Sequence, residues 1–270
     1  MTVKAFFKTP KGLLVIILTV LTGMAASVAG MTLVAPGLAA AVAVGMSIDA
    51  PIIRVREGEW IFPSGALLTG LFVAMILSPS ERWYVPAVTT AVAIVSKHLF
   101  RVHTANVFNP AALALIATYY VFDSEQSWWG ALPDLPSVAL VVLVIAGVYI
   151  TDRLNKMPGV LAFLGTYYLF FTIAAVVGDP GRVAELFRAP DLHAALFFAF
   201  FMVTDPPTAP VRHRDQVVFG VIVALVSCAA YELIGAAYFL LAGLLVGNAW
   251  EAWRRMRLRA LRAARRVAVA

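Results

Sequence analysis

The chain has 270 residues, of which 61% are hydrophobic and only 13% are charged. A soluble domain carries about 25% charged residues, and a single core of this size could not bury so much apolar surface. The composition therefore excludes an ordinary soluble enzyme and indicates an integral membrane protein in a lipid bilayer. The net charge of +6 does not predict a nucleic-acid partner, because the basic residues lie in short loops and at the chain ends.

Apolar segments that predict membrane-spanning helices recur along the whole chain. They cover residues 12–30, 32–52, 62–78, 84–98, 107–122, 136–151, 158–177, 192–204, 216–233 and 235–250. We therefore expect an all-α integral membrane protein with about ten transmembrane helices, in a single membrane domain over residues 1–266. Residues 251–270 form a basic tail, for which an interfacial helix on anionic lipid is the expected structure.

The loops alternate in charge along the chain. Eighteen of the 21 Lys and Arg residues lie at the termini or in every second loop, and only Arg82, Arg182 and Arg188 lie in the others. Lys and Arg accumulate in the cytoplasmic loops of membrane proteins. The pattern predicts a multi-pass protein of the inner (plasma) membrane with both termini in the cytoplasm.

Two stretches share the same order of predicted elements: a short apolar helix, a break with proline, a charged turn and a second helix. The first break contains Ser78-Pro79-Ser80, and the second, Thr204-Asp205-Pro206-Pro207, follows 127 residues later. With five spans in each half, repeats over about 12–122 and 136–250 should be inverted, as in many transporters and channels. Non-helical backbone at membrane depth must be buried in protein or line a wet cavity; alternatively, both breaks are ordinary interfacial loops.

The densest polar cluster runs from Lys97 to Pro110. Lys97 and Arg101 could donate hydrogen bonds to an anionic group such as a phosphate, and Asn109-Pro110 predicts a capped helix start, which also attracts anions. Alternatively, the cluster is a basic cytoplasmic loop. The spacing of five between His98 and His103 is not that of a helical metal pair, so we expect no metal site.

Three acidic residues lie near the ends of spans. Asp205 is a candidate site residue because intramembrane acids are usually functional; at the surface it would pair with Arg212 or Arg214. Asp49 and Glu232 are interpreted as solvated carboxylates; alternatively, either could pass a proton or a cation.

These segments resemble a known family. Lys97 with Phe108-Asn109-Pro110-Ala111-Ala112 is similar to the lysine and F-N-P-A segment of the RnfD/NqrB membrane subunits, and Val203-Thr204-Asp205-Pro206 to their A-T-D-P segment. Ser64 to Leu77 resembles their short T-G-L helix. The resemblance covers about residues 60–250 and implies an inverted repeat of ten helices, similar to the urea-transporter fold. It also implies flavin-linked electron transport coupled to Na⁺ or H⁺ movement, with redox partner subunits.

We therefore expect Lys97, Arg101, Asn109, Thr204 and Asp205 to line a cofactor site. Family members with covalent FMN attach it to the threonine of an S-G-A-T motif, and the best match here places Leu132 at that position. Leucine has no hydroxyl, so any flavin, FMN or riboflavin, should be held non-covalently. The alternatives are a channel or transporter for a small solute and an accessory redox protein of a biosynthetic pathway. No motif indicates the catalytic residues of a stand-alone enzyme.

Overall fold

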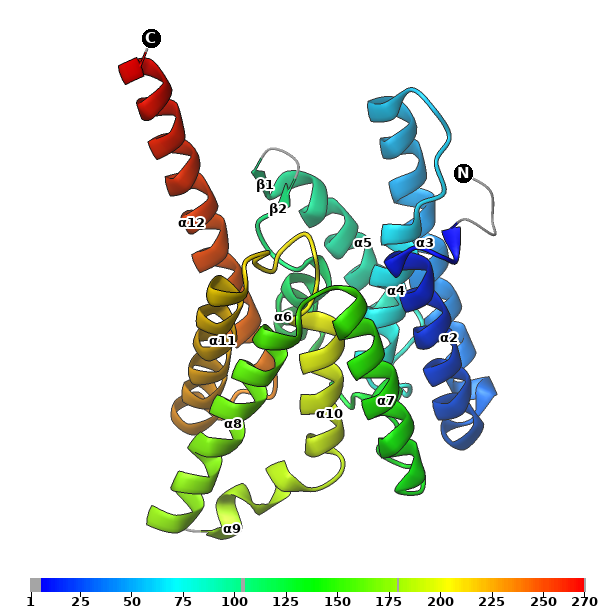
Figure 1. Ribbon diagram of the computed structural model, residues 1–270. Coiled ribbons are helices and arrows are strands. Elements are labelled where there is room, and N and C mark those ends of the chain that lie inside the picture. Colours follow the sequence, from blue (N-terminus) through cyan, green and yellow to red (C-terminus); the bar gives the residue numbers. More distant parts are fainter. Residues whose placement is uncertain (1–5, 103–104, 179, 270) are drawn as a thin grey trace.

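The structure, a computed structural model, describes residues 6–102, 105–178 and 180–269 and is almost entirely helical (Figure 1). The elements in chain order are α2 (Pro10–Ala29), α3 (Met31–Glu57), α4 (Ser64–Ile76), α5 (Tyr84–Leu99), β1 (Arg101–Val102), β2 (Ala105–Asn106), α6 (Pro110–Phe122), η1 (Trp129–Ala131), α7 (Val138–Arg153), α8 (Met157–Val177), α9 (Pro180–Val183), η2 (Ala184–Phe187), α10 (Asp191–Phe197), the π-helical turn η3 (Phe198–Met202), α11 (His213–Ile234) and α12 (Phe239–Val269).

Local sequence explains where several of these helices begin and end. The Thr9 hydroxyl accepts a hydrogen bond from the Gly12 amide at the start of α2, where Pro10 occupies the first turn. Proline suits this position because the first amides of a helix have no partner within it. At the other end, α3 stops at Gly58 and α11 at Gly235, both in the left-handed conformation that glycine adopts without steric cost.

Each of the ten apolar segments expected from the sequence falls on a helix, with α10 and η3 together forming one of them. The polar cluster after α5 forms a short antiparallel hairpin, with Arg101 paired to Asn106 and Val102 to Ala105. His103, half of the histidine pair considered from the sequence, lies outside the described residues, as does Lys4.

The last expected span and the basic tail form one continuous helix, α12, whose C-terminal part extends beyond the other helices (Figure 1). No proline or glycine follows Gly247, so nothing in the sequence breaks the helix there. Glu251 pairs with Arg254 and Arg255 one turn later, which supports the helix at the point where its sequence changes from apolar to basic.

The helices are apolar on their outer as well as their inner faces. In α8, Phe163, Tyr167 and Phe171 are fully buried, whereas Leu161 and Leu169 are more than half exposed. A helix that is hydrophobic all round belongs in a large core or in a membrane. By length and composition, α2, α3, α8 and α11 could each cross a membrane, and α4, α6 and the α10–η3 segment are shorter apolar helices.

The two halves of the chain pack in matching ways. In the first half α5 lies along α3 and α2 contacts α4; in the second half α11 lies along α8 and α7 contacts α10 and η3. The halves meet where α2 contacts α7 and where α6 contacts α12. The short helices α4 and α10 lie inside the bundle (Figure 1), with Phe72 of α4 edge-on to Phe197 of α10.

Candidate functional site

The first break, residues 77–83, is closed by the segment that follows α6. The Trp129 indole donates to the Ala74 carbonyl (2.6 Å) and the Trp128 amide to the Ile76 carbonyl (3.1 Å). The Ser78 amide donates to the Glu125 carbonyl (2.8 Å). The last carbonyls of a helix need partners from outside it, and here a second, buried segment supplies them.

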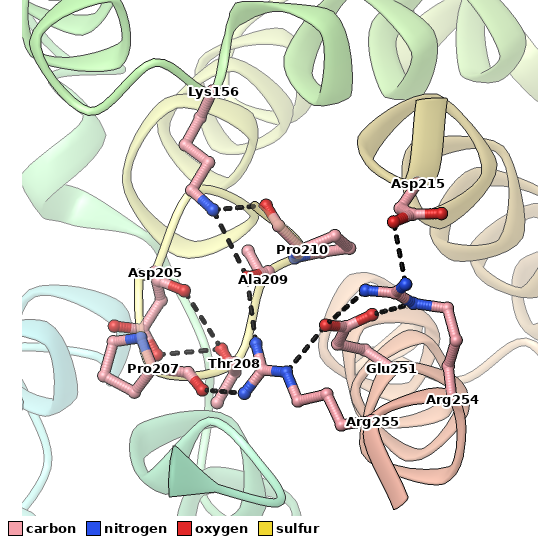
Figure 2. A network of polar contacts seen from close by, with 10 residues as sticks. All are labelled: Lys156, Asp205, Pro207, Thr208, Ala209, Pro210, Asp215, Glu251, Arg254 and Arg255. Carbon is pink, nitrogen blue, oxygen red and sulfur yellow. Dashed lines mark hydrogen bonds and ion pairs between the residues drawn. The ribbon is translucent and has the colours of Figure 1, made fainter. Parts of the chain in front are cut away.

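The second break, residues 203–210, is closed by two cationic side chains that approach it from two sides (Figure 2). The Lys156 ammonium, at the start of α8, donates to the carbonyls of Ala209 (3.2 Å) and Pro210. The Arg255 guanidinium of α12 donates to the carbonyls of Pro207 (2.7 Å) and Ala209 (3.0 Å). Backbone that has lost its helical partners is therefore satisfied by charged donors, which make stronger hydrogen bonds than neutral ones.

Arg255 is itself held by a buried carboxylate. Glu251, only 1% exposed, accepts from the guanidinium groups of both Arg255 (2.6 Å) and Arg254 (2.7 Å). Arg254 continues the network to Asp215 of α11, also at 2.7 Å (Figure 2). The basic end of α12 is thereby fixed to the second break and to α11.

Asp205 and Thr204, both predicted site residues, lie in this break. The Asp205 carboxylate accepts a hydrogen bond from the Thr208 hydroxyl (2.8 Å). Its described contacts do not include Arg212 or Arg214, which are exposed and were the partners considered for a position at the surface. The Thr204 hydroxyl donates to the Phe200 carbonyl (2.6 Å) in the π-helical turn. Turns of this kind often occur at functional sites.

The sequence predicts that Lys97 donates to an anionic ligand, but in the structure its ammonium already has a carboxylate partner. Its ammonium pairs with Asp49 of α3 (2.7 Å), and the other oxygen of the same carboxylate contacts the imidazole of His98 (2.8 Å). Asp49 is 0% exposed, so its interpretation as a solvated carboxylate is wrong. A buried carboxylate needs a charged or hydrogen-bonded partner, and the packing of α5 on α3 brings Lys97 and His98 to it.

Asn109 caps α6 as predicted: its side-chain oxygen accepts from the Ala112 amide (3.1 Å). The backbone amide of Asn109 donates to the side-chain oxygen of Asn248 in α12 (2.8 Å), and this bond joins the two halves of the chain. Arg101 lies in β1, where it pairs with Asn106 of β2. Of the five predicted residues, Lys97 lies at Asp49, Thr204 and Asp205 lie in the second break, and Asn109 lies at the start of α6; the charge of Lys11 acts on both Lys97 and Asp205.

The environment of Asp205 makes the stability of the folded protein depend on pH. Burial raises the pKa of this carboxyl to about 6, against the Thr208 hydrogen bond and the charges of Lys156, Lys11 and Arg255, which lower it. The folded protein then binds a proton more tightly than the unfolded chain does. This contribution to stability is present below the ordinary value of 3.8 and is lost as the pH rises through about 6.

Replacing Asp205 by asparagine should remove that pH dependence. We expect the unfolding temperature of the wild type in detergent to fall relative to that of Asp205→Asn as the pH rises from about 4 to about 7. Intrinsic tryptophan fluorescence measures the transition. Asp134→Asn, a change at an exposed aspartate, is the control and should follow the wild type. Parallel curves for the wild type and Asp205→Asn would contradict the assignment.

Four residues of these networks were not predicted as site residues. Lys156 entered only the count of basic residues, Arg254 and Arg255 entered that count and the basic tail, and Glu251 entered no argument. For Glu251 a signal was available, because a lone acidic residue precedes arginines by three and four positions on one predicted helix. For Lys156 no local pattern was available, since its partners are 53 and 54 residues away.

Comparison with known proteins agrees with the sequence motifs. The model of the NQR2, RnfD, RnfE family matches residues 7–141 and 135–239. Several relatives carry the name of one subunit, designated D, of an ion-translocating oxidoreductase complex. The chain is 24% identical over 236 residues to the relative from Pseudomonas paraeruginosa, covering 66% of this chain and 69% of that protein. It is 27% identical over 242 residues to the relative from Pseudomonas aeruginosa strain LESB58, covering 68% and 70%. The corresponding protein of Actinobacillus succinogenes is 24% identical over 264 residues, covering 70% and 74%. The resemblance found in the sequence is thereby confirmed, and the chain belongs to the NQR2, RnfD, RnfE family.

Proposed function

We propose that this protein is a membrane component of a multi-subunit complex that carries flavin-linked electron transport and couples it to the movement of Na⁺ or H⁺. The observation that carries the proposal is its similarity, over about two thirds of both chains, to proteins named as part of an ion-translocating oxidoreductase complex. Such a role requires redox partner subunits, and we place the protein in the inner membrane.

We further propose that the ten helical segments are membrane spans arranged as two inverted repeats. The matched packing of α3 with α5 and of α8 with α11 supports the repeat. So does the closure of the breaks: residues after α6 bond to the first, and Arg255, in the continuation of the corresponding helix α12, bonds to the second. The start of α2 and the end of α12 lie at the same end of the molecule (Figure 1), as an even number of crossings requires.

The outer segment after α6 does not fit a covalent flavin. Leu132, at the position of the family's attachment threonine, is 0% exposed and has a left-handed φ of 66°. It lacks a hydroxyl and packs in the hydrophobic core. An FMN linked by a phosphoester therefore does not fit at this position.

The same segment does offer polar atoms to a non-covalent ligand. The hydroxyls of Ser124 and Ser127 and both side-chain amide atoms of Gln126 are buried and have no hydrogen-bond partner among the described residues. Buried polar atoms normally have partners, and a flavin carries ring carbonyl and N–H groups that could bond to them. A flavin held here would supply electron transfer, while Ser124, Gln126 and Ser127 would orient it.

An absorption spectrum of the purified protein in mild detergent, before and after acid precipitation, tests the proposal. We expect a flavin band in the native sample and free FMN or riboflavin in the acid supernatant. Flavin that stays in the pellet would show a covalent link and overturn the argument from Leu132. A protein that remains colourless after incubation with FMN and with riboflavin would contradict the electron-transport role and favour a channel for a small solute.

A further inference from the structure

The C-terminal part of α12 projects from the helix bundle. Ion pairs of Arg254 and Arg255 with Glu251, and of Arg254 with Asp215, hold the helix against α11 and the second break. Beyond these contacts the helix continues to Val269 and extends past the other helices (Figure 1). Residues 257–269 lengthen it by about 20 Å. This projecting segment therefore faces partners outside the bundle.

Apolar residues recur on the projecting segment at the spacing of a coiled coil. Trp253, Met256, Ala260, Ala263 and Val267 follow one another at alternating intervals of three and four positions. These are the a and d positions of a heptad repeat, which form one apolar stripe along a helix. Trp253 is 51% exposed and Met256 is 47% exposed, so the rest of the described chain leaves the start of the apolar stripe uncovered.

Arginines occupy the positions beside the apolar stripe. Arg257 and Arg259, both exposed, stand at the e and g positions of the first heptad, and Arg266 stands at the g position of the second. The Arg257 guanidinium lies over the Trp253 ring, 5.4 Å from its centre. No acidic residue follows Glu251 in the sequence. Residues at e and g form the ion pairs across a coiled coil and thereby select the partner.

The projecting segment lacks charge compensation of its own. Arg262 lies three positions after Arg259, and three and four positions before Arg265 and Arg266. Like charges at these spacings destabilise a helix, and a helix of this length is marginal in water without tertiary packing. Negative charge supplied by a partner would relieve the repulsion and stabilise the helix.

We propose that residues 253–267 of α12 form a coiled coil with an acidic helix of a partner protein. The partner places apolar residues against the apolar stripe and Asp or Glu opposite Arg257, Arg259 and Arg266. A second copy of this chain does not fit, because it would set arginine against arginine in either relative orientation of the helices. The inference rests on the proposed membrane span in α12, and not on flavin or electron transfer.

The direction of α12 favours a protein partner over a lipid surface. An interfacial helix lies in the plane of the membrane, whereas α12 continues as one helix from its apolar part, the proposed span, into its basic part. No glycine or proline after Gly247 provides a point at which the helix could turn. At physiological ionic strength the charge of anionic lipid is screened over about 8 Å, which is less than the length of the projecting segment.

Binding of a synthetic helix to the full chain tests the proposal. The protein is placed in phosphatidylcholine nanodiscs in about 0.15 M NaCl. Fluorescence anisotropy then measures the binding of a labelled heptad peptide with leucine at a and d and glutamate at e and g, and of the same peptide with lysine at e and g. We expect the glutamate peptide to bind at least about tenfold more tightly. Equal binding of the two peptides, or binding of neither, would overturn the proposal.

Met256→Gln and Leu261→Gln separate the apolar stripe from a general gain in polarity. Both side chains are exposed, by 47% and 54%, so both variants should fold as the wild type does. Met256 is at a d position, whereas Leu261 is at a b position outside the stripe. Met256→Gln should weaken binding of the glutamate peptide at least about fivefold, because burial of the methionine is lost. Leu261→Gln should change it less than about twofold; equal losses would contradict a coiled coil.

The double variant Arg257→Glu/Arg259→Glu reverses the charge beside the apolar stripe. It should bind the lysine peptide more tightly than the glutamate peptide, because the e and g positions then carry the opposite sign. An unchanged preference for the glutamate peptide would show that the remaining arginines attract it without a defined register, and would overturn the assignment.

Other occupants of the apolar stripe give different results. Light scattering should give the same molar mass for the wild type and Met256→Gln, and a wild-type dimer that Met256→Gln dissociates would show that a second copy covers the stripe. In nanodiscs that also contain phosphatidylglycerol, the affinity for the glutamate peptide should stay within about threefold. Loss of binding there would show that the segment lies on anionic lipid instead. These measurements involve no flavin, so their outcome is independent of the spectroscopic test.

Discussion

Replacing Asp49 by alanine should destabilise the protein by about 3–5 kcal/mol, the usual effect of removing one partner of a buried ion pair. The carboxylate accepts from Lys97 at 2.7 Å and contacts His98 at 2.8 Å, and it is fully buried between α3 and α5. Its loss leaves the partly buried Lys97 ammonium, whose side chain is 17% exposed, without this counter-charge. A large fall in the unfolding temperature and in the yield of monodisperse protein would be measured by fluorescence and by size-exclusion chromatography.

The double variant Asp49→Ala/Lys97→Met separates the ion pair from simple packing. Removing both charges should recover much of the stability, because an apolar replacement of a buried ion pair is often neutral. Glu59→Ala, at an exposed acidic residue just beyond α3, is the control and should change little. Additive losses in the double variant would show that Asp49 and Lys97 are not coupled.

Gly220→Ala should separate α8 from α11 and destabilise the second half by about 1–3 kcal/mol or more. A Cβ atom at Gly220 would lie 2.4 Å from the Gly159 carbonyl oxygen and 2.9 Å from the Phe163 amide nitrogen. Both are backbone atoms, so no side-chain rotation can relieve the contact and the helices must move apart. The unfolding temperature and the fraction of aggregated protein measure the effect.

Gly165→Ala, in α8, provides the matched comparison. A Cβ atom there meets no atom of the described residues within 4 Å. Alanine stabilises an exposed helix interior by about 1 kcal/mol relative to glycine, so this variant should be as stable as the wild type or slightly more stable. Similar losses in Gly165→Ala and Gly220→Ala would mean that the close approach of α8 and α11 does not limit stability.

The helices could be predicted from the sequence because their signals are local. Runs of apolar residues and the Asn109-Pro110 start of α6 lie within the segments that they define, and helices occur at these places. The continuous α12 was missed as a single element. Its apolar and basic parts were treated separately because hydropathy changes at residue 251, although backbone propensity does not.

The candidate site was predicted only in part. Asn109 caps α6 as expected, and Thr204 and Asp205 lie in the second break. Lys97 was expected to donate to an anionic group, whereas the structure pairs it with Asp49. A lysine and an aspartate 48 residues apart carry no mutual signal in one sequence, so a basic cluster is easily taken for an anion site.

By itself, the sequence determined the membrane class, the order of the helices, the position of the two breaks and the family, because hydropathy, proline, caps and short motifs act over a few residues. Only the tertiary structure decided which charges meet. Asp49 joins Lys97 and His98 because α3 and α5 pack side by side, and Lys156 and Arg255 reach the second break because α8 and α12 flank it. In a low-dielectric interior each buried charge must find a partner, and the packing of the helices selects that partner.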